Sequence, residues 1–150
     1  MKNLFDTARL TEIKERVANL RPESQRQWGK MSAAQAVAHL TAGMELALGD
    51  RKPPRVLIGR VIGAIIKPMV LKDDAPMRRN SPTVPTLEVM DERDLNKERA
   101  QLLAVIDRFA AVGPVGCTTH PHSFFGRLKP DEWAILMYKH LDHHLRQFGV

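Results

Sequence analysis

The sequence is poor in several residue types, and each shortage excludes a class of protein. A single cysteine, Cys117, cannot form an internal disulfide or a four-cysteine zinc site. Aromatic residues make up only 5% of the chain, too few for a surface that stacks nucleic-acid bases. Residues 1–17 lack the apolar core of a secretory signal, so we expect a reducing, cytoplasmic setting.

The rest of the composition is that of an ordinary globular protein, with 43% hydrophobic and 27% charged residues. A length of 150 residues fits one domain, 1–150, with a core of its own. The formal net charge of +6 comes from segment 51–79. The chain has 23 basic and 17 acidic residues. This segment holds eight of the basic and two of the acidic residues, which leaves fifteen of each sign in the rest of the chain. Such a segment is typical of an anionic ligand site, a phosphate-rich partner surface or a solvated loop.

Apolar residues recur at helical spacing in four long stretches, which predicts an all-α four-helix bundle. Ser32 and Gln35 form a capping-box pattern, and Gly113-Pro114 ends the third stretch. No strand pair or internal repeat is present. The predicted helices are Asp6–Leu20, Ser32–Leu48, Asp91–Val112 and Lys129–Gln147.

The chain between the second and third of these helices is less regular. Arg55–Lys67 predicts a short extra helix, weakened by Gly59 and Gly63 and too short to span a bilayer. We expect it to cover the bundle, and a helix lying on a membrane surface is the alternative. Three prolines in Lys72–Pro85 predict a long loop.

The last predicted helix carries two histidines, His140 and His144, in the middle of its apolar face. One turn apart, two imidazoles can bind the same ion, and burying them is costly unless each finds a partner. Its charged residues are expected to point away from this face. These are Asp131, Lys139, Asp142 and Arg146.

A third histidine, His39, lies on the second predicted helix between the small residues Ala36 and Gly43, which leave room beside it. A lone histidine is more often a hydrogen-bonded core residue, but three imidazoles match an open catalytic metal site. Such a site leaves a position for water or substrate and suits zinc, nickel or iron.

The motif His140-Leu-Asp-His-His-Leu-Arg-Gln147, with His39 behind Trp28 and the capping box, resembles the DinB/YfiT-like superfamily of metalloenzymes. Within that superfamily the chain resembles a branch of uncharacterised bacterial proteins of unknown function, over most of its length and most strongly from His120 onward. The motifs that carry this second likeness are His120-Pro121, Phe124-Phe125-Gly126-Arg127-Leu128, Pro130-x-Glu132-Trp133 and Leu145-Arg146-Gln147-Phe148-Gly149.

The resemblance implies a four-helix bundle whose metal ligands are His39, His140 and His144, with Gln147 at the superfamily's glutamine position. It also implies a cytoplasmic, often dimeric enzyme acting on a small molecule. Characterised relatives are hydrolases and transferases that attach low-molecular-weight thiols to electrophiles.

Other residues are assigned lesser roles. Gln147, His120 and His122 are candidates for the pocket wall, although a loop histidine more often bonds to the backbone. His143 is expected beside the ligands or in solvent, and Cys117 as a small buried residue. The motifs His-Glu-x-x-His, Ser-x-x-Lys and Gly-x-Ser-x-Gly are absent, which argues against a zinc protease and a serine nucleophile.

Three hypotheses follow. The first is a metal-dependent hydrolase or thiol transferase. The second is a non-catalytic module that binds an anionic partner, nucleic acid or a membrane surface, through segment 51–79; no helix-turn-helix or zinc-finger pattern supports nucleic-acid binding. The third is a bundle whose histidines only bond to one another.

Overall fold

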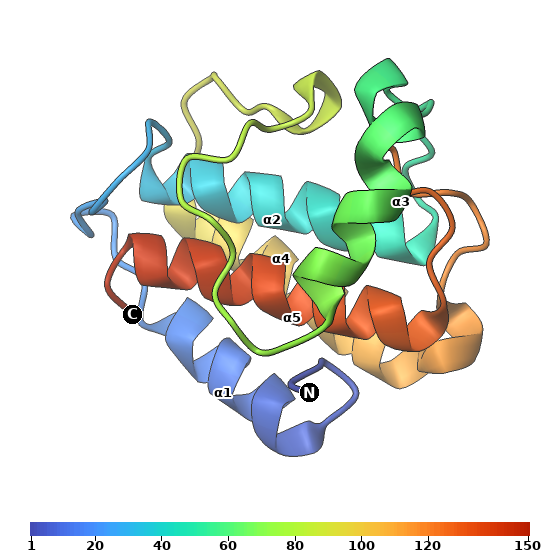
Figure 1. Cartoon of the computed structure of the whole chain (residues 1–150). Helices are drawn as coiled ribbons and strands as arrows, with labels where there is room; N and C mark the ends of the chain where they lie inside the picture. The colour runs from blue at the N-terminus through green and yellow to red at the C-terminus, as the bar shows by residue number, and fades with distance from the viewer.

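The computed structural model describes residues 1–150 and consists of helices joined by loops (Figure 1). The predicted all-α class is confirmed, as are the four long helices. The α-helices are α1 (Thr7–Ala18), α2 (Ala33–Leu48), α3 (Leu57–Leu71), α4 (Leu95–Val112) and α5 (Pro130–Gln147), and the 3-10 turns are η1 (Pro85–Leu87) and η2 (Pro114–Gly116).

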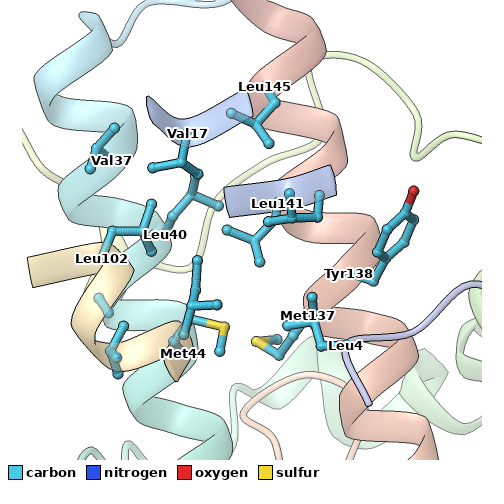
Figure 2. Close-up of a cluster of buried hydrophobic side chains, with 14 of the residues drawn as sticks. Leu4, Val17, Val37, Leu40, Met44, Leu102, Met137, Tyr138, Leu141 and Leu145 are labelled. Atoms are coloured by element: carbon cyan, nitrogen blue, oxygen red, sulfur yellow. The ribbon is translucent and has the colours of Figure 1, made fainter. Parts of the chain in front are cut away.

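Four of the helices form the bundle: α2 packs on α4 and α5, and α1 packs on α4 and α5 (Figure 1). Their apolar faces meet in one core between α2 and α5 (Figure 2), with α1 below and α4 behind in the view of Figure 1. Burying each of these aliphatic side chains contributes about 1.5–3 kcal/mol. The labelled core residues include Val17, Val37, Leu40, Met44, Leu102, Leu141 and Leu145.

Side-chain caps fix where the site-bearing helices begin. At α2 the capping box is confirmed: Gln35 N donates to Ser32 Oγ over 3.2 Å, and Ser32 N donates to Gln35 Oε1 over 2.9 Å. At α5, Lys129 N donates to Glu132 Oε2 over 2.8 Å, with Pro130 in the first turn. These caps set the register that aims the histidines at one another.

The extra helix is longer than predicted. The sequence pattern ended it at Lys67, before Pro68, whereas α3 continues through Pro68 to Leu71 and has 15 residues. Proline removes one helical hydrogen bond. Leu71 is buried and Val70 packs against the core, so their burial offsets that loss. None of the helices combines the length and the apolar composition that crossing a membrane requires.

Two charged residues of α5 that were expected in solvent are buried, so that expectation is wrong. Lys139 Nζ donates to the carbonyls of Val70 and Asp73, over 2.6 and 3.0 Å. Asp142 accepts from Arg16 and Arg146, each over 2.8 Å. The helical wheel gives the direction of a side chain but not what packs on that side. Here the loop after α3 and helix α1 cover it. Asp131 and Arg146 are exposed, as predicted.

Candidate metal centre

The three predicted ligands come together between α2 and α5. One ring nitrogen from each of His39, His140 and His144 lies within 4.8 Å of the others. The ring centroids are 4.8–5.0 Å apart, and the rings meet edge to face at 71–85°.

The backbone of η1 orients the first imidazole. His39 Nδ1 lies 2.9 Å from the carbonyl oxygen of Leu87, and both groups are buried. A carbonyl can only accept, so Nδ1 carries the proton and donates it. The lone pair of His39 is therefore on Nε2, which faces the other two histidines.

A two-step hydrogen-bond chain orients His144. Gln147 Nε2 donates to the carbonyl of Trp28 over 2.7 Å, which fixes the direction of the amide. Gln147 Oε1 then accepts the Nδ1 proton of His144 over 2.8 Å, so the lone pair of His144 is on Nε2. Gly29 makes room for this chain: it has φ +79°, and a Cβ there would overlap the Gln147 amide.

His140 is placed by its neighbours on α2. Its ring lies against Gly43, where a Cβ would stand 3.0 Å from Nδ1 and 3.1 Å from Cε1. Its Nε2 lies 2.8 Å from His39 Nε2. Because His39 Nε2 bears no proton, His140 supplies the hydrogen between the two nitrogens. Tetrahedral zinc with Zn–N bonds of about 2.0–2.1 Å places two ligand nitrogens about 3.3 Å apart. An ion in place of that hydrogen would therefore increase the distance between the two nitrogens by about 0.5 Å. The three residues therefore fit a metal ion.

Burial keeps the three imidazoles neutral, as metal ligands must be. It lowers the pKa of His39, and it lowers the pKa of His144 to about 3. The pKa of His140 lies well below its usual value, through burial and then through the neighbouring histidines. The cluster contains no carboxylate. A divalent ion held here would keep its full charge, which favours hydroxide or thiolate in an open position.

The structure places both connector histidines in structural hydrogen bonds outside the cluster. His120 Nε2 lies 3.1 Å from the carbonyl of Pro53. His122 Nδ1 accepts from the backbone N–H groups of Phe124 and Phe125, over 3.1 and 3.2 Å. Burial lowers the pKa of His122 to about 4, with Arg55 as a smaller cause. These contacts are the backbone bonds that loop histidines usually make.

The remaining polar residues lie around the cluster rather than in it. The His143 ring stands 5.0 Å from His144 and 5.7 Å from Trp28, so it adjoins the site as predicted. Tyr138 points away from the ligands and donates to Glu12 over 3.2 Å (Figure 2). Cys117 is only half-buried, which corrects its expected burial, and partial burial raises its thiol pKa to about 11.

Segment 51–79 does not form one free basic surface. Arg51 pairs with Glu45, and Lys67 pairs with Glu132 over 3.1 Å. Two more of its arginines are engaged otherwise: Arg55 donates to the carbonyls of Gly59 and Phe124, and Arg79 stacks on the Trp28 ring at 4.1 Å.

Sequence reasoning missed Leu87, the residue that orients His39. Its contribution is a backbone carbonyl 48 positions away along the chain, and no side-chain pattern marks it. The role of Gly29 was also missed, because its positive φ and its contact with Gln147, 118 positions away along the chain, leave no mark in the local sequence.

Comparison with known proteins identifies the family of the chain. The family model described as "Protein of unknown function (DUF1569)" matches residues 2–149. That family is in the DinB/YfiT-like fold clan, which confirms the resemblance at the level of the clan. No curated protein and no solved structure is significantly similar to the chain. With nearly its whole length matched, the chain belongs to the DUF1569 family.

Proposed function

We propose that this protein is a metal-dependent enzyme in which His39, His140 and His144 hold one divalent cation. One observation carries the proposal: two of the three imidazoles, those of the buried His39 and His144, are turned by fixed acceptors, Leu87 O and Gln147 Oε1, so that their free nitrogens converge. A buried histidine without a ligand role also needs an acceptor for its N–H group, but its free nitrogen need not converge with those of two other histidines. In known metal sites, ligating histidines donate their other N–H to a carbonyl or amide in this way.

Zinc or nickel fits the ligand set best, and iron is also compatible. Imidazole suits all three metals, and zinc and nickel bind nitrogen ligands more tightly than ferrous iron does. Three protein ligands leave at least one position of the ion for water or substrate.

The proposed reaction is hydrolysis, or transfer of a low-molecular-weight thiol, with a small electrophile as substrate. A bound divalent ion would lower the pKa of a water or thiol coordinated to it. Burial within the bundle keeps the ligands neutral. The oxygens of Leu87 and Gln147 hold the Nδ1–H groups of His39 and His144 in hydrogen bonds. Both reactions need an anionic nucleophile, hydroxide for hydrolysis and thiolate for thiol transfer, and the absence of a carboxylate from the cluster favours the formation of either anion.

Elemental analysis of untagged protein tests the metal site. We expect about one zinc or nickel per chain in the wild type, and none in His39→Ala, His140→Ala or His144→Ala, with helical circular dichroism retained. The matched control is His143→Ala, which removes the adjacent histidine that makes no part of the cluster and should keep the metal. Full metal content in any of the three variants would remove that residue from the ligand set.

The reaction class is tested on the metal-loaded protein by mass spectrometry. Small electrophiles are incubated with and without a small thiol, with His140→Ala as the blank. A conjugate of thiol and electrophile indicates a transferase, and products whose masses sum to that of the substrate plus one water indicate a hydrolase. Stoichiometric metal without either product across a broad panel would contradict the enzymatic part of the proposal.

A further inference from the structure

A polar hollow lies between α2, α4 and the segment that contains η1. It has two parts, with volumes of about 150 and 200 Å³. Arg51, Thr86 and Leu87 line both parts, so the two form one continuous space. Their combined volume reaches the range of small-molecule pockets, which begins at about 300 Å³. In Figure 1 the yellow-green segment that contains η1 lies above α2.

This hollow is separate from the metal centre. None of the three clustered histidines lines it. Leu87 stands between the two places, because its carbonyl oxygen accepts from His39 while the residue also lines both parts of the hollow. A ligand in the hollow would therefore not occupy the position left open on a bound ion.

The first part of the hollow, which we call the acidic end, contains a buried carboxylate. Glu98 is only 5% exposed, and its Oε1 accepts from Arg93 over 3.2 Å. Its Oε2 has no donor within the chain, although a carboxylate has about four acceptor positions. Because a buried charge is costly unless its hydrogen bonds are made, a donor in the hollow would stabilise Glu98.

The rest of the acidic end also favours a cation. The Thr41 hydroxyl donates its proton to the carbonyl of Val37 over 3.1 Å, so its oxygen can only accept from a ligand. The walls carry three carboxylates and two guanidinium groups, although the whole chain has a net charge of +6. An ammonium group, with three donors and one positive charge, matches these walls. The charged lining residues are Glu45, Glu88, Glu98, Arg51 and Arg93.

The second part of the hollow, which we call the basic end, has the opposite charge. Arg51 and Lys52 line it, and none of its lining residues is acidic. Arg51 already pairs with Glu45, whereas Lys52 takes part in none of the ion pairs of the chain. A carboxylate would accept a charge-assisted hydrogen bond from the free ammonium group of Lys52.

The two ends therefore require opposite charges within one small space. We infer that the hollow beneath η1 binds a small zwitterion, with its ammonium group at Glu98 and its carboxylate at Lys52. A ligand with only one charge would leave one end without a partner. This inference does not depend on the metal.

Nuclear magnetic resonance on isotope-labelled protein tests the inference, with γ-aminobutyrate as the probe. We expect saturable shifts of the backbone amide signals of Thr41 and Leu87, which line the hollow. Butylamine and butyrate each carry one of the two charges and should bind about tenfold more weakly or less. The His140→Ala variant should bind γ-aminobutyrate as the wild type does, so a failure of the metal site would not affect this result.

Two variants that each remove one charge assign the ends. Glu98→Gln should weaken γ-aminobutyrate binding about tenfold and abolish its advantage over butyrate, whereas Lys52→Gln should weaken it and abolish its advantage over butylamine. Circular dichroism checks the fold of both variants, and Lys52 is exposed, so its replacement should leave the fold intact. The matched controls, Glu92→Gln and Lys97→Gln, change exposed residues outside the hollow and should bind as the wild type does.

Three results would overturn the inference. The first is the absence of shifted signals at the hollow with all three compounds, which would leave only water there. The second is γ-aminobutyrate binding that neither Glu98→Gln nor Lys52→Gln weakens. The third is butyrate or butylamine binding as tightly as γ-aminobutyrate in the wild type, which would assign the hollow to a ligand with a single charge.

Discussion

Two regions depart in opposite ways from the usual pattern, in which apolar side chains are buried and polar ones are exposed. They are the space between α2 and α5 and the outer face of α3. Between the helices, the polar residues His39, His144 and Gln147 are buried, and each has a hydrogen-bond partner. On α3, by contrast, five large apolar side chains are exposed to solvent. These are Leu57, Ile58, Val61, Ile65 and Met69. Buried polar groups and exposed apolar patches are the two departures that carry functional information.

The comparison shows that glycine produces both departures. Gly43 on α2 removes a side chain so that the His140 ring can lie between the helices. Gly59 and Gly63 on α3 remove side chains so that the Phe124 carbonyl can approach, which leaves the large residues outside. The first arrangement lets three imidazoles gather between α2 and α5, and the second leaves large apolar side chains exposed.

The largest expected effect is loss of the ion from the interior. Replacing His140 by alanine removes one of three ligands, and we expect the affinity for zinc to fall beyond the range of chelator competition. The helical fold should remain, because the neighbouring core residues are unchanged. Competition with a coloured chelator measures this, and retention of nanomolar affinity would show that His140 is not a ligand.

Gly43→Ala should weaken metal binding while changing the stability of the metal-free protein little. An added methyl would stand 3.0–3.1 Å from the His140 ring and displace it, so we expect at least tenfold weaker metal binding. In the metal-free protein, the gain of about 1 kcal/mol in helix propensity should offset much of the crowding. Chelator competition and urea unfolding measure the two effects. Unchanged affinity would mean that the His140 ring need not lie against α2.

The orientation of His144 depends on Gln147. Gln147→Leu removes the acceptor of the Nδ1 proton, and loss of such partners typically weakens metal binding about 10–100-fold. The control is Gln101→Leu, an exposed glutamine on α4. Binding as tight as in the wild type would make the chain from Trp28 to His144 structural only.

Acid should destabilise the metal-free protein through His122. Its native pKa is about 4, against about 6.5 when unfolded. Between these values only the unfolded chain takes up the proton, so stability falls as the pH drops through this window. From pH 7 to 5 the contribution of His122 is about 2 kcal/mol. Urea unfolding of His122→Asn should show a smaller fall than the wild type; equal falls would mean that His122 titrates normally.

The smallest expected effect concerns Cys117. Its thiol pKa of about 11 leaves little thiolate at neutral pH, so alkylation by iodoacetamide should be much slower than for a free thiol. Mass spectrometry over time measures this rate. Fast alkylation would reveal a more open connector than the structure has.

Much of the interior was predictable from the sequence, and little of the surface was. The spacing of His140 and His144 within an apolar stripe, and the small residues around His39, depend on helical periodicity alone. The orientation of His39 depends on Leu87, and the burial of Lys139 and Asp142 depends on segments distant in sequence. The exposed apolar face of α3 was missed because the helix is apolar on nearly all sides, so its pattern does not reveal which face packs inward.

The most direct test of the metal centre is a crystal structure of protein grown with zinc, with anomalous diffraction measured at the zinc absorption edge. We predict one peak per chain between α2 and α5, about 2.0–2.1 Å from Nε2 of His39, His140 and His144. The Nδ1 contacts to Leu87 and Gln147 should be unchanged. A cluster without a peak, with its histidines still bonded to one another, would contradict the account.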